Sequence, residues 1–366
     1  MHNIFIIAGE ASGDLHGSNL VKELKLISPA VTLQGWGGEL MQQQGVTILK
    51  HYKELAFMGF TEVIANLGTI LHNFKLCKQQ ITTCKPSAII FIDYPGFNLR
   101  MAKWAKQQGY TTIYYISPQI WAWKANRIHT IKKYVDHMIV ILPFEKAYYN
   151  TCNYAVSYVG HPLIKVIANY KITNPNTNTK QVIALLPGSR KQEIKSKLPI
   201  MLSVAALFPS YKFVIAKAPG IDEALYTQYI TPYANVTLTH NGTYSILNHA
   251  VAAIVTSGTA TLETALFKVP QVVCYRGSAI SYAIAKRLIK IKYISLVNLI
   301  MDKSIVKELI QHECNTHNLH RELNTLLTSH NYTMLSDYDA LYTLLQAGGD
   351  ASAHAATLVQ AAITNS

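Results

Sequence analysis

Short apolar segments recur along the chain and alternate with longer segments in which apolar residues repeat every three or four positions. Several short segments are apolar throughout, which is typical of strands in a parallel sheet covered on both faces. The predicted strands lie at residues 4–8, 88–92, 112–116, 138–142, 182–186, 212–216, 252–256 and 271–275. Strands that alternate with helices in this way predict a doubly wound α/β architecture.

This architecture starts twice along the chain. A strand leads into a Gly-containing turn at residues 9–13, and a later strand leads into the turn at 187–190. Between them, the Asn- and Thr-rich stretch 171–180 has the composition of a linker. We therefore expect an N-terminal domain over 1–170, a C-terminal domain over 171–345, and a final helix in 346–366 that packs back on the first domain. Two doubly wound halves predict a cleft at the carboxyl ends of both sheets.

Composition narrows the class of protein. Hydrophobic residues make up 49% of the 366 residues and charged residues 14%, which excludes a disordered chain. The longest nearly apolar stretch, 198–208, is shorter than the ~20 residues of a membrane-spanning helix. The N-terminus enters a predicted strand directly, which disfavours a signal peptide. The five cysteines are widely spaced without a C-x-x-C pair, which indicates a reduced, cytoplasmic chain.

The chain carries a net charge of +13, from 33 Lys and Arg against 20 Asp and Glu. Such a surface attracts nucleic acids, anionic lipid headgroups or phosphorylated substrates. The basic residues are dispersed, without a run of five, which argues against nucleic acid. Basic residues combined with an amphipathic helix favour a membrane surface. A solvated basic face remains the alternative.

Two turns in the second half have the composition of phosphate-binding loops. Each follows a predicted strand and opens a helix, so its backbone N–H groups and the helix dipole can bind an anion. The candidate donor-binding residues are Gly188, Ser189 and Arg190 in the first turn, then Ser257, Gly258, Thr259 and Ala260 in the second. Glu263 follows in the second helix and could bind ribose hydroxyls. The alternative for each turn is an ordinary helix cap, although two such turns favour a nucleotide-diphosphate site.

Asp93 follows a predicted buried strand in the first half, so it should lie at the edge of the cleft. A carboxylate there can accept a proton from an attacking hydroxyl, and its alternative role is to cap the next turn. Glu10, Asp14 and His16 in the first turn and helix are rival bases. We predict that these three, with Ser12 and Gly13, form an acceptor or anion-binding group.

The segment 58–81 predicts a helix with one apolar face. The residues of this face that we expect to touch the membrane are Val63, Leu67, Ile70, Leu71 and Phe74. The alternative is a helix whose apolar face packs on the protein core. Standard metal-binding motifs are absent, and we predict no metal and no cofactor.

Together, a series of motifs resembles the lipid-A-disaccharide synthase family, whose members are glycosyltransferases of the two-Rossmann-domain GT-B type. The resemblance runs from Gly9 to about Gln311. The motifs occupy 9–17, 58–63, 93–98, 117–123, 142–145, 159–163, 186–190, 257–263 and 295–298. The sequence departs from the family's pattern at Gly96, often a second Asp, and at Val297 and Lys307, where Pro is common.

The resemblance implies an inverting transfer from UDP-2,3-diacylglucosamine to 2,3-diacylglucosamine 1-phosphate, called lipid X, which gives a β-1,6-linked disaccharide 1-phosphate and UDP. It implies Asp93 as the base. It carries Arg190, residues 257–260, Glu263 and Asn298 over to the donor site, and it places Gln311 near the donor. Because both substrates are acylated, we expect a cytoplasmic enzyme that is peripheral on the inner membrane and contacts its cytoplasmic leaflet.

Two other classes of function stay open at this point. The first is another GT-B UDP-sugar enzyme, such as an N-acetylglucosaminyltransferase or a UDP-sugar 2-epimerase, which would share the fold and the donor site. The second is a non-catalytic basic protein that binds RNA or an anionic membrane, although stacking-aromatic RNA motifs are missing. The oligomeric state is open as well, with a homodimer as one alternative.

Overall fold

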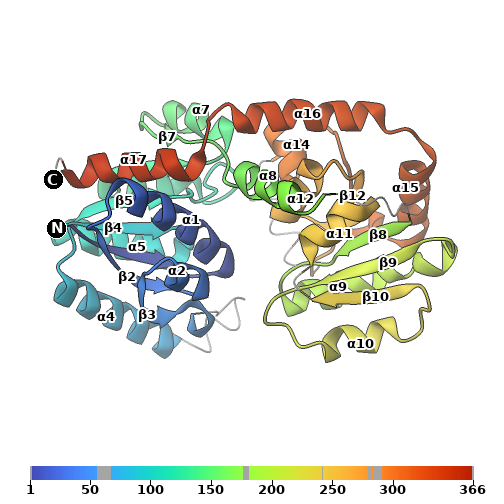
Figure 1. The fold of residues 1–366 in the computed structure, drawn as a ribbon, viewed down its shortest axis with the longest axis horizontal. Coiled ribbons are helices and arrows are strands. Elements are labelled where there is room, and N and C mark those ends of the chain that lie inside the picture. Colours follow the sequence, from blue (N-terminus) through green and yellow to red (C-terminus); the bar gives the residue numbers. More distant parts are fainter. Residues whose placement is uncertain are drawn as a thin grey trace. The chain divides into compact units, whose positions relative to one another are not determined.

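The computed structural model describes residues 2–55, 67–175, 181–240, 242–278, 282 and 291–364. The chain divides into two compact units, shown in Figure 1. Unit 1 comprises Met1–Pro162 and Leu345–Ser366, and unit 2 comprises Leu163–Leu344. The sequence placed the division at 170–171. The division lies earlier because helix α8 (Leu163–Thr173) packs on other helices of unit 2, and Lys171 Nζ donates to the Leu266 carbonyl at 2.9 Å.

Unit 1 contains a seven-stranded parallel sheet in the order β3-β2-β1-β4-β5-β6-β7. Its strands are β1 (Asn3–Ala8), β2 (Thr32–Gly37), β3 (Thr47–His51), β4 (Ala88–Ile92), β5 (Thr111–Tyr115), β6 (His137–Val140) and β7 (Ser157–Tyr158). The central strands β1 and β4 are buried along almost their whole length, because helices cover both faces of the sheet.

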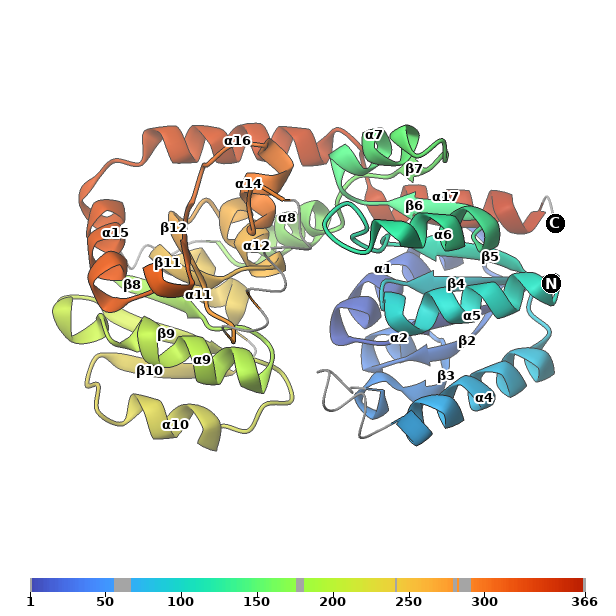
Figure 2. The same ribbon diagram turned by 180° about the vertical axis from the view of Figure 1, so that it is seen from behind.

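Helices flank this sheet on both faces (Figure 2). The helices of unit 1 are α1 (Ala11–Ile27), α2 (Glu39–Gln43), α4 (Leu67–Cys84), α5 (Pro95–Gln107), α6 (Ile128–Tyr134), α7 (Pro143–Thr151) and α17 (Ala351–Thr364), with short 3-10 helices at Tyr52–Glu54 and Ala125–Arg127. Side chains of α4, α5 and α6 join Phe5, Ile7 and Phe91 in one core cluster. Helix α1 contacts strands β1, β2 and β4, α17 contacts β5, and the two helices contact each other.

The C-terminal helix α17 belongs to unit 1. It packs on α1, and Ser28 Oγ donates a 2.6 Å hydrogen bond to Gln360 Oε1. Small residues make the close approach possible, since Ala355 and Ala356 are fully buried on this helix. Segments from the two ends of the chain therefore form one core.

Unit 2 contains a six-stranded parallel sheet in the order β10-β9-β8-β11-β12-β13. Its strands are β8 (Val182–Leu186), β9 (Lys212–Lys217), β10 (Val236–His240), β11 (Ala250–Thr256), β12 (Gln271–Tyr275) and β13 (Lys307–Ile310). Its further helices are α9 (Lys191–Leu202), α10 (Ala224–Ile230), α11 (Thr243–His249), α12 (Thr259–Leu266), α14 (Leu296–Met301), α15 (Thr316–Thr328) and α16 (Tyr332–Gln346), with 3-10 helices at Ala205–Leu207 and Gln311–Glu313.

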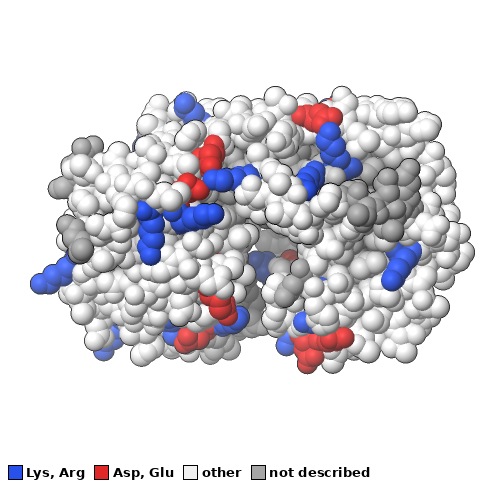
Figure 3. All heavy atoms as spheres, viewed as in Figure 1, with Lys and Arg blue, Asp and Glu red and all other residues white. Residues whose placement is uncertain are grey.

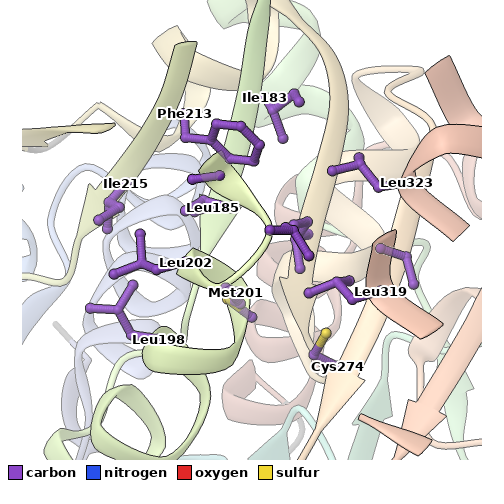
Figure 4. Packing of buried hydrophobic residues seen from close by; sticks show 14 of the residues in the cluster. Ile183, Leu185, Leu198, Met201, Leu202, Phe213, Ile215, Cys274, Leu319 and Leu323 are labelled. Atoms are coloured by element: carbon purple, nitrogen blue, oxygen red, sulfur yellow. The ribbon is translucent and has the colours of Figure 1, made fainter. Parts of the chain in front are cut away.

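Figure 4 shows the larger core cluster of unit 2. Leu198 and Leu202 of α9 lie against strand residues such as Phe213, and Leu319 and Leu323 of α15 pack on the same cluster from the other end. These leucines repeat at helical spacing, so one face of each helix is buried and the other is exposed. The packing fixes α9, and with it the turn between β8 and α9.

The expected α/β fold of GT-B type is confirmed. Strands predicted at 88–92, 182–186 and 271–275 coincide with the observed β4, β8 and β12. Each sheet continues into strands that the pattern did not indicate, namely β2, β3, β7, β10 and β13. None of the described helices is long and apolar enough to cross a membrane. Figure 3 shows one face of the molecule, on which Lys and Arg side chains are scattered.

Candidate functional site

Each sheet reverses its strand order at one point, between β1 and β4 in unit 1 and between β8 and β11 in unit 2. Ligands of doubly wound folds bind outside the carboxyl ends of the strands at this switch point. Asp93 directly follows β4, and the turns that begin at Pro187 and Ser257 directly follow β8 and β11. The topology therefore places most of the predicted residues at the two positions where such folds bind ligands.

The turn after β8 is shaped by a glycine and a glutamate. Gly188 has a φ of +112°, and a Cβ at this position would collide with the Glu193 carboxylate. Glu193 Oε2 accepts a 3.1 Å hydrogen bond from the Ser189 N–H, so this acid occupies part of the predicted anion-binding turn. Arg190 is exposed at the start of α9, and its Nη1 lies 3.8 Å from Glu193 Oε1. The guanidinium is accessible to a phosphate.

The turn after β11 is open. Gly258 has a φ of +134° and precedes α12, and a Cβ there would meet no atom within 4 Å. Gly258 and Thr259 are exposed, while Ser257 and Ala260 are half-buried. A hydrogen bond inside the turn stabilises its conformation, because Thr261 Oγ1 donates to the Gly258 carbonyl at 2.8 Å. The first N–H groups of α12 can therefore face a ligand anion.

Glu263 lies on α12 close to this turn and is half-buried. Tyr244 on α11 donates a hydrogen bond to Glu263 Oε1 at 3.2 Å, and burial raises the pKa of the Glu263 carboxyl. A carboxyl with one oxygen fixed by a tyrosine is suited to bind vicinal hydroxyls with the other. Nothing in the sequence pattern pointed to Tyr244, because the pairing joins two different helices.

Asn298 was predicted to bind the donor, and the structure gives its side chain another role. It is fully buried. Its Oδ1 accepts from the backbone N–H groups of Ile305 and Val306, and its Nδ2 donates to the Val306 carbonyl and to Glu308 Oε1. The amide is fully used in connecting α14 to β13, and a direct contact of Asn298 to the donor stays a prediction.

Gln311 begins the 3-10 helix after β13 with a φ of +52°. Its Oε1 accepts a 3.1 Å hydrogen bond from the Gly277 N–H. Its Nε2 is buried and has no hydrogen-bond partner among the described residues. The Gln311 side chain thus fixes the segment after β12, and its Nε2 amide group can still donate a hydrogen bond to a ligand.

Asp93 lies in a strained turn of unit 1. Asp93 and Tyr94 have φ values of 44° and 47°, a left-handed conformation that costs about 1–2 kcal/mol per residue. The Asp93 carbonyl accepts hydrogen bonds from Tyr114 Oη at 2.6 Å and from Asn98 Nδ2 at 2.8 Å. Asn98 is fully buried and also donates to the Ile92 carbonyl at 3.2 Å. Such enforced strain is common at functional sites.

The ends of β1 and β4 meet through Gly9, where any Cβ would collide with the ring of Tyr94. Glu10 is half-buried and Ser12 is exposed at the start of α1, whereas Gly13 is buried against Ala8. Glu10 and Ser12 therefore keep accessible surface beside the Asp93 turn, as a ligand-binding role requires.

Asp14 was predicted within the same group, but it is 2% exposed. Its carboxylate accepts hydrogen bonds from the backbone N–H groups of Gly38, Leu40 and Met41, at 2.8, 3.0 and 3.1 Å. The acid therefore caps α2. Its oxygens are already used inside the protein, and a contact with an acceptor or a role as a base stays a prediction.

His16, which is half-buried, and the buried His161 interact electrostatically in unit 1. Burial lowers the pKa of His16 to about 4. Burial, with a smaller contribution from His16, lowers the pKa of His161 to about 3. His16 is therefore uncharged at neutral pH, and the anion-binding group gains no positive charge from it. Its Nδ1 is buried without a partner among the described residues, so it can still form a neutral hydrogen bond.

The predicted membrane-facing residues do not share one environment. Val63 lies outside the described residues. Leu67 is the first residue of α4, and the environment of its side chain is not described. Leu71 is 67% exposed, whereas Ile70 is half-buried. Phe74 is half-buried and stacks on Phe97 with ring centroids 4.4 Å apart, so this ring packs within unit 1, and its contact with a membrane stays a prediction.

Comparison of the sequence with known proteins identifies the family to which the chain is related. Residues 4–362 match the family described as lipid-A-disaccharide synthetase. The lipid-A-disaccharide synthase 1 of Legionella pneumophila strain Lens is 40% identical over 333 residues, 88% of this chain and 87% of that protein. The lipid-A-disaccharide synthase of Coxiella burnetii strain Dugway 5J108-111 is 37% identical over 344 residues, 90% of each chain.

Solved structures resemble this fold at low identity. UDP-GlcNAc 2-epimerase of Neisseria meningitidis, bound to UDP-GlcNAc, aligns with a TM-score of 0.66, 12% identity and full coverage of both chains. The kitacinnamycin glycosyltransferase aligns with a TM-score of 0.67, 11% identity and 99% coverage of both chains. These likenesses concern the fold alone. On the sequence relationship, the chain belongs to the lipid-A-disaccharide synthase family of glycosyltransferases.

Proposed function

We propose that this protein transfers 2,3-diacylglucosamine from UDP-2,3-diacylglucosamine to the 6-hydroxyl of 2,3-diacylglucosamine 1-phosphate, lipid X. The products are the β-1,6-linked disaccharide 1-phosphate and UDP. The observation that carries the proposal is the family relationship along residues 4–362. The relatives that share about two-fifths of its residues are named lipid-A-disaccharide synthases.

In this proposal the donor binds at the switch point of unit 2. The UDP diphosphate contacts Arg190 and the exposed N–H groups of the turn at 257–260, while Glu263 binds the ribose hydroxyls. A guanidinium and helix N-terminal N–H groups stabilise the negative charge that develops on a leaving diphosphate. The accessible side chain of Arg190 and the open space above Gly258 support these roles.

Asp93 acts as the base toward the acceptor. Its carboxylate takes the proton of the 6-hydroxyl while the hydroxyl oxygen forms a bond to the anomeric carbon. The bond from that carbon to the β-phosphate oxygen breaks on the opposite face, and its electron pair leaves with UDP. The α-linked donor thus gives a β-linked product. The hydrogen bonds to the Asp93 backbone support the role, because they fix the position of the acid.

The enzyme works at the cytoplasmic leaflet of the inner membrane as a peripheral protein, because both substrates carry acyl chains. Leu71 on α4 is exposed, and the net charge of +13 favours anionic lipid surfaces. The proposal holds for a monomer and for a homodimer. Leu71→Ser should weaken cosedimentation with anionic liposomes, whereas Leu207→Ser, an exposed leucine of unit 2, serves as the matched control. Equal binding by both variants would remove α4 from the membrane contact.

The reaction is tested by incubating the purified protein with both lipid substrates and a chelator, followed by mass spectrometry. We expect disaccharide 1-phosphate in the wild type and in Asp339→Asn, an exposed aspartate of unit 2, but not in Asp93→Asn. Turnover of UDP-N-acetylglucosamine without any acylated product would instead favour a different UDP-sugar enzyme.

A further inference from the structure

A cavity of about 580 Å³ lies in unit 1 next to the Asp93 turn. Tyr94, Pro95 and Gly96, the three residues that follow Asp93, line one side of it. The other walls come from α4, α5 and the segment 124–130. Its volume falls in the range of about 300–1,000 Å³ that is typical of small-molecule sites.

Four cationic side chains line this cavity, and its lining among the described residues includes no Asp or Glu. They are Arg100 and Lys103 on α5, Lys124, and Arg127, of which the first three are exposed and Arg127 is half-buried. Within the described residues, none of the four forms an ion pair with Asp or Glu. Burial and the nearby Arg100 lower the pKa of Arg127, as expected where like charges gather.

Aromatic rings lie beside all four cations without neutralising them, and Lys103 Nζ is 5.8 Å from the centroid of the Tyr134 ring. The guanidinium of Arg100 lies 5.8 Å from the centroid of the Phe74 ring. Lys124 and Arg127 lie 4.3 and 5.6 Å from the centroid of the same Trp123 ring. Cation–π contacts orient a charge but leave its hydrogen-bond donors available. These four cations can therefore bind an anion with several acceptor oxygens, such as a phosphate.

Another part of the cavity lining is apolar, with Ile70 and Phe74 from α4 and Phe97 and Leu99 from α5. One buried polar group interrupts it. Asn73 is 4% exposed, and its Oδ1 has no hydrogen-bond partner among the described residues. A buried amide oxygen without a partner is costly, and a ligand N–H or O–H would satisfy it.

We propose that this cavity binds the acceptor, a glucosamine phosphate that carries acyl chains. The phosphate binds Arg100, Lys124 and Arg127, an acyl chain lies along Ile70 and Phe74, and Asn73 accepts a hydrogen bond from an N–H or O–H of the acylated sugar. The inference rests on the proposed function and assigns the acceptor to residues beyond Glu10, Ser12 and His16. An amphiphile with a phosphate matches a cavity lined by cations on one part and by apolar side chains on another.

The test removes two exposed cations at once, in the variant Arg100→Gln/Lys124→Gln, which spares the half-buried Arg127 and so the fold. The matched control is Lys75→Gln/Lys146→Gln, which removes the same charge from two exposed positions of unit 1 that do not line the cavity. Both variants are assayed in neutral detergent micelles, with lipid X and with the same lipid lacking its phosphate.

We expect the cavity variant to raise the KM for lipid X about tenfold or more, with the KM for the UDP-sugar unchanged. With the acceptor that lacks phosphate, the cavity variant should match the wild type, because no phosphate contact remains to be lost. The control variant should match the wild type with both acceptors. An equal KM for lipid X in the two variants would overturn the proposal, whereas the absence of any product from the wild type would overturn the proposed function.

A membrane phosphate could use the same cations, and a second measurement separates the two sources. Binding to phosphatidylglycerol vesicles should fall equally in the cavity and control variants if the surface attraction depends on net charge alone. A loss of vesicle binding confined to the cavity variant, with an unchanged KM for lipid X, would show that the cavity holds a membrane headgroup and would overturn the assignment to the acceptor.

Discussion

The turn after β4 in unit 1 and the turn after β11 in unit 2 follow buried parallel strands in the same topological position. In unit 1 the protein closes the turn with its own groups, because Tyr114 and Asn98 both donate to the Asp93 carbonyl. In unit 2 the turn is left open, with space above Gly258. The same sheet order can therefore fix one acid in place or leave backbone donors free for a ligand.

The comparison predicts that the fixed acid matters most for the chemical step. Asp93→Asn keeps the size of the side chain but removes the base, so turnover should fall by a factor of about 10²–10⁴. UDP binding, measured by calorimetry, should be unchanged, since the donor turns lie in unit 2. A variant that loses UDP affinity along with turnover would show that Asp93 does not serve the acceptor alone.

Acid should affect unit 1 first. Because His16 and His161 have pKa values of about 4 and 3, against about 6.5 when unfolded, the unfolded chain binds more protons below pH 6.5. Stability should therefore fall from pH 6.5 downward, by about 2 kcal/mol per histidine at pH 5. All four tryptophans, Trp36, Trp104, Trp121 and Trp123, lie in unit 1, so their fluorescence follows this unit during unfolding.

The histidine pair is isolated by replacing His161 with Gln, which cannot take up a proton. The variant should lose a large part of the pH dependence of unfolding between pH 6.5 and 5, even where its stability at pH 8 is lower. A slope identical to that of the wild type would mean that other groups control the acid sensitivity of unit 1.

The open turns of unit 2 should control the donor. Arg190→Gln removes one charge-assisted contact, which is worth about 1.5–3 kcal/mol, so kcat/KM for the UDP-sugar should fall about ten- to a hundredfold. Arg321→Gln, at an exposed arginine paired with Glu322, is the control. If the loss appeared only in the KM for lipid X, the donor would have to bind elsewhere.

Replacing Gly188 or Gly258 in the two turns of unit 2 should give the smallest effects, and the comparison concerns the loss of stability. Gly258→Ala should cost about 1–2 kcal/mol from its positive φ alone, because a Cβ there has open space. Gly188→Ala has the same kind of strain and also collides with Glu193, so its loss of stability should be larger. Thermal unfolding of both variants checks the order, and an equal loss would show that Glu193 moves away at no cost.

Much of the fold could be predicted because its central strands are continuously apolar. The run Ala88–Ile92 is completely buried, and its pattern alone defines it. Strands β7 and β2 could not be predicted, since β7 has only two residues and β2 contains two glycines. Their strand conformation depends on hydrogen bonds to a neighbour that is distant in the sequence.

The position of a candidate residue was predictable where it lies in the turn after a strand, as with Asp93 after β4 and Arg190 after β8. It was not predictable where a polar side chain serves a distant backbone. Asp14 and Asn298 have the residue types of a binding site, yet their oxygens accept hydrogen bonds from residues that the local sequence does not associate with them. A motif gives the chemistry of a side chain but not its partners. The cations around Trp123 were missed for the same reason, since they come together only through the fold.

The return of the chain to unit 1 at Leu345 has a consequence for biosynthesis. Unit 2 is one continuous segment, whereas unit 1 needs α17 from the end of the chain, which packs on α1 near its beginning. During translation, unit 2 can complete its core while unit 1 still lacks a helix. The buried apolar face of α1 therefore stays uncovered until residues 351–364 have left the ribosome, and a chain that stops before them would leave that face exposed to aggregation or to chaperones.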